Sequence, residues 1–205
     1  MKRADGTGSA TLLHATGMSV LASAWSPDGS WLVFTQTQTG SGDIYGIRPE
    51  IDSVPLPLVA TEFIERTPAL SPDGRWLAYS SDRSGTLQVY VQPFPSADDA
   101  VWQVSDAGGL EPKWAQNGRE LFYVNGNQEM VVAEFETSPT FRRLAEHVLF
   151  SVAEYDMGLV HRNYAVSHDD QRFLIMKEAG ESVNELTLVL NFFEVLKQRV
   201  GNGND

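Results

Sequence analysis

The sequence predicts an all-β fold made of repeated sheets, and three observations support this prediction. Residues 25–31 read Trp-Ser-Pro-Asp-Gly-Ser-Trp, and residues 70–76 repeat them as Leu-Ser-Pro-Asp-Gly-Arg-Trp. Weaker copies surround Asn117 and Asp169, so that Asp28, Asp73, Asn117 and Asp169 are spaced by 45, 44 and 52 positions. An apolar run of strand length follows every copy. A period of this size with strand-like flanks is typical of a β-propeller, here with four blades of four antiparallel strands.

The repeated motif has the chemistry of a turn between two antiparallel strands. Proline fixes φ at the first corner, aspartate can hydrogen-bond to the local backbone, and glycine accepts positive φ. Asn117-Gly118 keeps this chemistry, whereas Asp169-Asp170 lacks the glycine and departs furthest from the motif. The aspartates are not dense enough along the chain for a calcium-binding loop. We therefore interpret them as turn-capping residues.

Four strands are expected in each of the first three units and three in the last. The expected ranges are 21–25, 31–36, 43–48 and 56–60; 66–70, 76–81, 87–92 and 101–105; 110–114, 120–125, 129–136 and 144–150; and 162–166, 172–177 and 185–191. Residues 192–200 have helical character and predict a short C-terminal helix. Trp25, Trp31, Trp76 and Trp114 recur at blade positions and are expected in the core between blades, whereas Trp102 follows a polar loop and is expected to be exposed.

Residues 10–15 read as a single strand that precedes the first turn motif. An unpaired sheet edge is a liability, so we expect this strand to complete the last unit. It could close a four-bladed ring within one chain, or be exchanged between two chains to give an eight-bladed homodimer. Residues 1–9 and 200–205 are polar and are expected to be mobile, which leaves residues 10–199 as the propeller domain.

Net charge, cysteine content and the length of apolar runs limit which partners and which cellular compartment we expect. The 205 residues include 27 acidic and 15 basic side chains, a net charge of −12, which argues against a nucleic-acid partner. The absence of cysteine excludes disulfides and thiolate metal sites. No apolar stretch approaches the ~18 residues that span a membrane, and none follows the amino terminus as in a signal peptide. We expect no membrane insertion and a cytoplasmic chain as it stands, while a periplasmic or membrane-tethered parent stays open.

The motif apolar-Ser-Pro-Asp-Gly-x-Trp-Leu-x-Phe/Tyr, with Ser-Asp-Arg-Ser-Gly at residues 81–85, resembles the TolB-like propeller repeat. That repeat also occurs in tricorn-type and prolyl-oligopeptidase-type propellers. Residues 188–197 resemble the closing segment of bacterial TolB-like propellers, including those appended to serine/threonine kinases and transcriptional regulators. The resemblance covers residues 10–199. Because rings of this family commonly have more blades, the resemblance implies that these four are a fragment of a longer parent, and a larger or dimeric ring stays open beside a closed four-bladed one.

The candidate functional residues lie where the inner strands begin, at one mouth of the central channel. In a propeller the first strand of each blade lines the channel, and ligands bind at its mouth. Aligning the inner strands on the turn motif gathers a polar set there: Glu65, Arg66, Glu111, Lys113, His161, Arg162 and Asn163. This set either solvates a water-filled channel or binds a small polar or anionic ligand, with Arg66 and Arg162 on either side of it.

The sequence contains no Gly-x-Ser-x-Gly nucleophile elbow. We therefore expect a non-catalytic module without a cofactor, which binds a protein or a small-molecule ligand through its channel mouth and loops. The alternative is a hydrolase of lactones or esters. It resembles lactonase-type propellers, with a channel Ca²⁺ held by Glu65, Glu111 and Asn163 that would polarise an ester carbonyl. A third possibility is a stable fragment whose activity resides in another domain.

Overall fold

The computed structural model describes residues 1, 4–38, 41–96, 100–137, 141–155, 162–177 and 185–189. The described strands form four antiparallel sheets, which we call blades I to IV. Blade I contains β1 (Ser19–Trp25), β2 (Leu32–Gln38), β3 (Ser41–Ile47) and β4 (Leu56–Val59); blade II contains β5 (Glu65–Leu70), β6 (Trp76–Ser81), β7 (Gln88–Pro93) and β8 (Trp102–Gln103); blade III contains β9 (Leu110–Trp114), β10 (Glu120–Val124), β11 (Glu129–Glu136) and β12 (Arg142–Ser151); and blade IV contains β13 (Tyr164–Val166), β14 (Phe173–Lys177) and β15 (Glu185–Val189).

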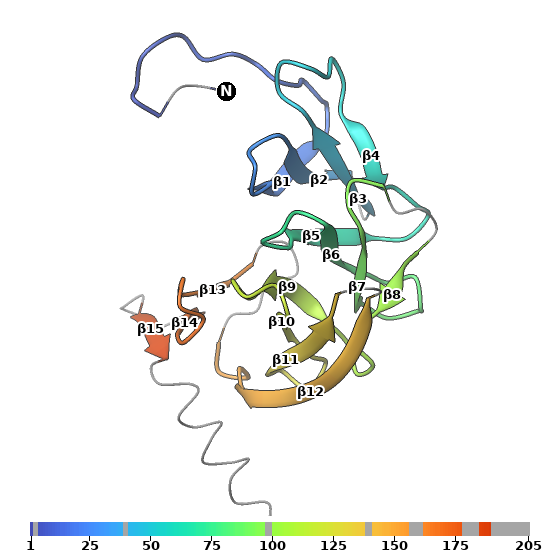
Figure 1. Ribbon diagram of the computed structural model, residues 1–205, viewed down its shortest axis with the longest axis vertical. Coiled ribbons are helices and arrows are strands. Elements are labelled where there is room, and N and C mark those ends of the chain that lie inside the picture. Colours follow the sequence, from blue (N-terminus) through green and yellow to red (C-terminus); the bar gives the residue numbers. More distant parts are fainter. Residues whose placement is uncertain are drawn as a thin grey trace, which may run out of the picture.

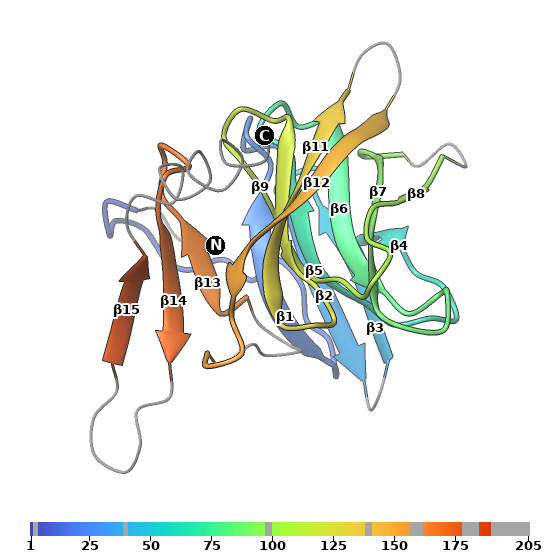
Figure 2. The same cartoon turned by 90° about the horizontal axis from the view of Figure 1, so that it is seen from below.

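The four blades follow one another along an arc (Figure 1). The first strand of each blade, β1, β5, β9 or β13, lies toward the concave side, and β4, β8 and β12 lie on the outside of the first three blades. Figure 2 shows the same sheets turned by 90°, with blade IV at one end. The predicted all-β propeller architecture is confirmed, and its strands agree with the expected ranges to within about three residues. The predicted C-terminal helix lies outside the described residues, and in the described chain no helix is long and apolar enough to cross a membrane.

The prediction that residues 10–15 form a closing strand within the chain is wrong. These residues have no regular secondary structure, and the described part of blade IV pairs only β13 with β14 and β14 with β15. The segment lies instead beside blade I, where Leu12, Leu13 and His14 line a cavity together with Val20 and Phe34. Apolar contact with blade I therefore replaces strand pairing with blade IV. Exchange of this segment between two chains stays a prediction.

The turn motif is fixed by hydrogen bonds that involve its serine as well as its aspartate. In blade II, Ser71 Oγ donates to Asp73 Oδ1 over 2.6 Å and accepts from the N–H of Trp76 over 3.0 Å. Blade I repeats both bonds from Ser26, and hydrogen bonds from Ser26 and Ser30 lower the pKa of Asp28 to about 2. The turn-capping interpretation of the aspartates is confirmed. The hydrogen-bonding role of the serine was not predicted from the sequence.

The fourth turn keeps this geometry without glycine. Ser167 Oγ donates to Asp169 Oδ1 and accepts from the N–H of Arg172. Asp170 takes the place of the glycine with φ of 58°, a value that aspartate tolerates better than most residues. The same backbone hydrogen bonds close this turn and the third one, where Ala115 replaces the serine, so the turn depends on its backbone geometry more than on Gly itself.

Three hydrophobic cores lie between neighbouring blades. Between blades I and II the core includes Val33, Ile44, Leu77, Tyr79 and Tyr90; between II and III it includes Ala78, Val89, Val91, Leu121 and Tyr123; and between III and IV it includes Phe122, Val124, Met130, Phe173 and Ile175. Side chains alternate along each strand, so that one strand contributes to the cores on both sides of its blade. Each blade is stabilised mainly by its neighbours.

The tryptophans follow the prediction in three of five cases. Trp76 and Trp114 are buried, and Trp31 is partly buried against the core between blades I and II. The predicted burial of Trp25 is wrong, since its side chain is 49% exposed. The predicted exposure of Trp102 is also wrong. Its ring packs edge-on against Trp76, with centroids 5.7 Å apart, and is partly buried against the core between blades II and III.

We expect Ser71→Ala to lower the free energy of unfolding by about 1–3 kcal/mol, because it leaves the buried N–H of Trp76 without its acceptor. Urea unfolding followed by tryptophan fluorescence would measure the change. Ala115 occupies the same motif position in blade III, so Ala115→Ser is the matched control and should cost less than Ser71→Ala. Equal losses from both variants would contradict a specific role for the serine.

Candidate functional site at the inner strands

A β-bulge recurs at one position of the inner strands. In β5, Arg66 pairs with Ser80 and Ala69 with Ala78, so that Thr67 and Pro68 together face a single residue of β6. In β9, Leu110 pairs with Val124 and Lys113 with Phe122, which leaves Glu111 and Pro112 in the same arrangement. Thr67 has φ of 50° and Glu111 has φ of 54°. Positive φ is rare outside glycine, so both bulges hold strained backbone on the channel side.

These bulges were not predicted from the sequence, although two prolines within the inner strands indicate them. Pro68 and Pro112 stand inside runs that otherwise read as strands. A proline cannot donate to the sheet ladder, so within a sheet it marks an edge or a bulge. Pro68 and Pro112 lie in β5 and β9, which are the edge strands of their sheets, and the structure places a bulge at both prolines.

Arg162 links three blades through the carbonyls that the bulges expose. It precedes β13 of blade IV, and its Nη2 donates to Pro112 O of blade III over 2.8 Å. The same nitrogen lies 3.5 Å from Pro68 O of blade II. A guanidinium presents several donors in a fixed plane and stays charged, so it suits two carbonyls that converge from different strands.

Glu111 and Asn163 meet at the boundary between blades III and IV. The backbone N–H of Asn163 donates to Glu111 Oε2 over 2.8 Å, and Glu111 is 1% exposed. The hydroxyl of Tyr164 donates to the carbonyl oxygens of Glu111 and Phe122, at 2.7 and 3.2 Å. Burial raises the pKa of Tyr164, so this hydroxyl stays a donor. These bonds fasten the start of β13 to the bulge of β9.

Lys113 lies on the same boundary, beside Arg162 and Asp170. Its side chain is partly buried, and burial together with the positive charge of Arg162 holds its pKa below the ordinary value for lysine. The negative charge of Asp170 acts in the opposite direction. Asp170 is 8% exposed and accepts from the N–H of Gln116 over 2.8 Å, and burial raises its pKa. Two cations and one carboxylate therefore share a partly dehydrated region.

Glu65 and Arg66 lie at a different boundary, between blades I and II. Glu65 is 1% exposed and accepts hydrogen bonds from Thr61 Oγ1 over 2.5 Å and from Ser81 Oγ over 3.5 Å. Burial raises the pKa of Glu65, and the nearby charge of Asp43 adds to this effect. The backbone of Gly42 in β3 approaches so closely that a Cβ there would lie 2.9 Å from Glu65 O. Glu65 therefore contributes to packing between two blades.

The described residues of the predicted set thus divide into two groups. Lys113, Arg162, Glu111 and Asn163 come together between blades III and IV, whereas Glu65 and Arg66 lie between blades I and II. His161 is outside the described residues. Within the described ranges, no group of three or more His, Cys, Asp or Glu side chains lies close enough to hold a metal ion. The calcium hypothesis for Glu65, Glu111 and Asn163 stays a prediction.

Among the surface cavities of the described residues are the following three, and none of the six described residues of the predicted set lines them. One of about 220 Å³ lies between the turns of blades I and II, beside Asp28 and Asp73. One of about 340 Å³ lies beside Phe135 and Leu144 of blade III. The third, of about 310 Å³, lies between the N-terminal segment and blade I. The inner-strand cluster is therefore a polar surface of the channel side and not one of these cavities.

We expect Arg162→Met to lower the free energy of unfolding by about 2 kcal/mol, because a charge-assisted hydrogen bond to Pro112 O is lost and buried carbonyls lose their donor. Chemical denaturation would measure the loss. The matched control is Arg142→Met. Arg142 pairs with Glu136 at the surface with its side chain 66% exposed, and its loss should cost less than about 1 kcal/mol. A control that costs as much as Arg162→Met would refute the inter-blade link.

Comparisons with known proteins agree with this architecture. TolB from Acinetobacter baumannii has a TM-score of 0.67 at 14% identity, over 93% of this chain and 45% of that chain. A puromycin-hydrolysing peptidase from Mycobacterium tuberculosis has a TM-score of 0.57 at 14% identity, over 87% of this chain and 28% of that chain. A gluconolactonase from Xanthomonas campestris has a TM-score of 0.53 at 15% identity, over 85% of this chain and 60% of that chain.

At these identities the structural similarity shows the fold alone, and the chain spans less than two thirds of each of these proteins. No curated protein matches the sequence. The family model described as the TolB beta propeller domain matches residues 6–150, more than half of the chain. Together with the four consecutive blades, this match establishes that the chain belongs to the TolB β-propeller domain family.

Proposed function

We propose that the chain is a non-catalytic binding module that recognises an anionic group of a protein partner or of a small ligand. The binding surface is the channel side between blades III and IV, at Lys113 and Arg162. A rigid propeller suits this role, because it presents inner-strand side chains from several blades on one surface.

The observation that carries the proposal is the partly dehydrated pair of cations at Lys113 and Arg162. Arg162 uses Nη2 on backbone carbonyls, and no described hydrogen bond occupies the ammonium group of Lys113. Asp170 supplies one negative charge against two positive ones and is itself hydrogen-bonded to Gln116. Burial lowers the pKa of Lys113 most and the charge of Arg162 adds to it, and an incoming carboxylate or phosphate would offset this repulsion from Arg162. The two positive charges of Lys113 and Arg162 lie close together in a chain whose net charge is −12.

We expect citrate, used as a multivalent anionic probe, to bind the wild-type chain and to bind Lys113→Met at least about tenfold more weakly, the equivalent of one charge-assisted hydrogen bond. Binding requires protonated Lys113, whose pKa lies below its ordinary 10.5, so affinity should fall as the pH rises through that lowered pKa. Isothermal titration at constant ionic strength and several pH values would measure both effects.

Lys177→Met is the matched control, because Lys177 of β14 forms a surface ion pair with Glu154, which follows β12, and its loss should leave citrate binding unchanged. Equal weakening by both lysine variants would mean that citrate responds only to overall charge, and the proposed site would be rejected. An unchanged affinity of Lys113→Met would also reject it.

The alternative, a calcium-dependent hydrolase, requires a cation on the channel side of the blades. If it held, about 1 mM Ca²⁺ would raise the thermal unfolding midpoint by several degrees, because a cation that binds only the native state stabilises it by mass action, and a chelator would reverse the shift. Under the binding-module proposal we expect the midpoint to be the same with calcium and with chelator. Glu111→Gln, which keeps the acceptor for the N–H of Asn163, would abolish a calcium-dependent shift.

A further inference from the structure

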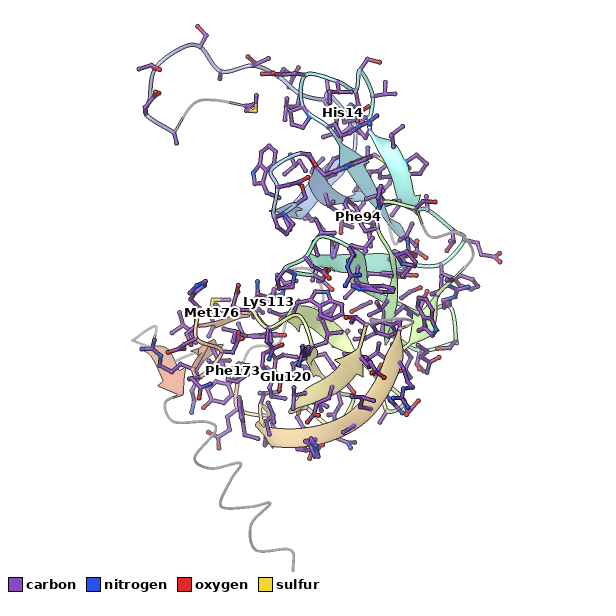
Figure 3. The ribbon with its side chains drawn as sticks, in the orientation of Figure 1. His14, Phe94, Lys113, Glu120, Phe173 and Met176 are labelled. Atoms are coloured by element: carbon purple, nitrogen blue, oxygen red, sulfur yellow. The ribbon has the colours of Figure 1, made fainter. Side chains whose placement is uncertain are left out.

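The cavity of about 220 Å³ between the turns of blades I and II lies outside the proposed anion site. Two turn motifs and the segment that follows β7 line it together. Figure 3 shows Phe94, which belongs to this lining, apart from Lys113. The lining combines aromatic rings, prolines and carboxylates, and the residues that give the cavity this chemistry are Pro27, Asp28, Trp31, Asp73, Phe94 and Pro95.

Trp31 and Phe94 form an aromatic wall of the cavity. Their rings pack edge to face, with centroids 5.6 Å apart and an interplanar angle of 74°. Both side chains are only partly buried against the core between blades I and II, so part of their surface stays available in the cavity. The face of an aromatic ring carries partial negative charge and attracts cations, and the indole of tryptophan attracts them most strongly. This wall therefore favours a ligand that is flat, apolar or positively charged.

Asp28 and Asp73 line the same cavity from the same position of two successive turn motifs. In the described structure, Asp28 accepts hydrogen bonds only from neutral groups: the hydroxyls of Ser26 and Ser30 and the N–H of Ser30. These bonds lower its pKa to about 2, so Asp28 stays negatively charged at neutral pH. Asp73 pairs with Arg75 over 2.7 Å, but Arg75 does not line the cavity. None of the described lining residues is basic, and the cavity therefore favours a cation.

Trp31 already holds one guanidinium group, that of Arg48, which does not line the cavity. The central carbon of this guanidinium lies 5.1 Å from the centroid of the Trp31 ring. Asp52 binds the same group with both oxygens, since Nη2 donates to Oδ1 over 2.7 Å and Nε donates to Oδ2 over 3.0 Å. A guanidinium is planar and presents a fork of donors, so it suits an aromatic ring combined with a carboxylate. The cavity offers the same combination in Trp31 and Asp28.

We propose that this cavity binds a guanidinium group, carried either by an arginine side chain of a peptide or by a free guanidinium compound. The group lies against Trp31 and Phe94 and donates to Asp28, while Asp73 adds a second negative charge. A guanidinium is preferred to an ammonium group because it stacks on rings and is more weakly hydrated. The cavity and the proposed anion site bind groups of opposite charge, and neither depends on the other.

The test is an NMR titration of the chain with acetylarginine amide, which carries a single guanidinium charge. The indole N–H signal of Trp31 should shift and saturate, whereas that of Trp114, in the core between blades II and III, should not. Acetyllysine amide, with a free side-chain ammonium, has the same charge and should bind at least about threefold more weakly. A capped Gly-Arg-Gly peptide identifies the source of the group: tighter binding than that of acetylarginine amide indicates a peptide, and equal binding indicates a free guanidinium compound.

Asp28→Asn removes one charge from the cavity and keeps the turn. Asn117 occupies the same motif position in blade III, where its Oδ1 accepts from the N–H of Arg119 over 2.8 Å. We expect Asp28→Asn to weaken binding of acetylarginine amide at least about threefold, the scale of one partly exposed ion pair. Asp169→Asn is the matched control, because it makes the same change in the fourth turn, outside the cavity, and should leave binding unchanged.

Arg75→Gln changes the charge in the opposite direction. It removes the ion pair of Asp73 and should strengthen binding about threefold. Circular dichroism of each variant confirms that it is folded. The proposal is overturned if the Trp31 signal does not shift up to the solubility limit of the probe, or if Asp28→Asn and Asp169→Asn weaken binding equally. Equal binding of the arginine and lysine probes overturns the preference for guanidinium, and weaker binding by Arg75→Gln overturns the role of Asp73.

Discussion

Burial of both faces of every sheet is the constraint on which this structure depends. A four-stranded blade has no hydrophobic core of its own, since its side chains point alternately to either side of the sheet. The three cores all lie between blades, and residues such as Leu77 and Ala78, adjacent in one strand, belong to different cores. Stability is therefore approximately a sum over neighbouring pairs of blades.

The turns of neighbouring blades meet at the three boundaries in two different ways. At the first two, the turns touch through proline and glycine: a Cβ on Gly74 would lie 3.6 Å from Pro27, and one on Gly118 would lie 3.8 Å from Pro72. At the third, Gln116 replaces the proline and Asp170 the glycine, and an N–H to carboxylate hydrogen bond takes over. Proline has no N–H, so this bond could not form at the other two boundaries.

The polar character of the third boundary extends to the inner strands. Lys113 stands where the first two blades have Ala24 and Ala69, and Arg162 reaches from blade IV to carbonyls of blades II and III. The result is a pair of cations at the third boundary, whereas the charged residue buried at the first boundary is Glu65. The family and its fold leave function open, because propellers support many activities. The proposed anion site rests on these residues and not on the similarity to lactonases or peptidases.

The sequence by itself determined the repeat, the strands and the turns, because these depend on local chemistry: Ser-Pro-Asp-Gly fits only a few turns, and alternating apolar runs fit a sheet. The alignment of inner strands placed seven residues at one channel mouth, and the structure brings four of them together between blades III and IV: Lys113, Arg162, Glu111 and Asn163. Only the tertiary structure decided that Glu65 belongs to another boundary, that Trp25 is exposed and Trp102 is packed, and that residues 10–15 lie on blade I. Those outcomes depend on which faces meet across blades and on single-residue bulges at Thr67 and Glu111, which redirect the side chains that follow.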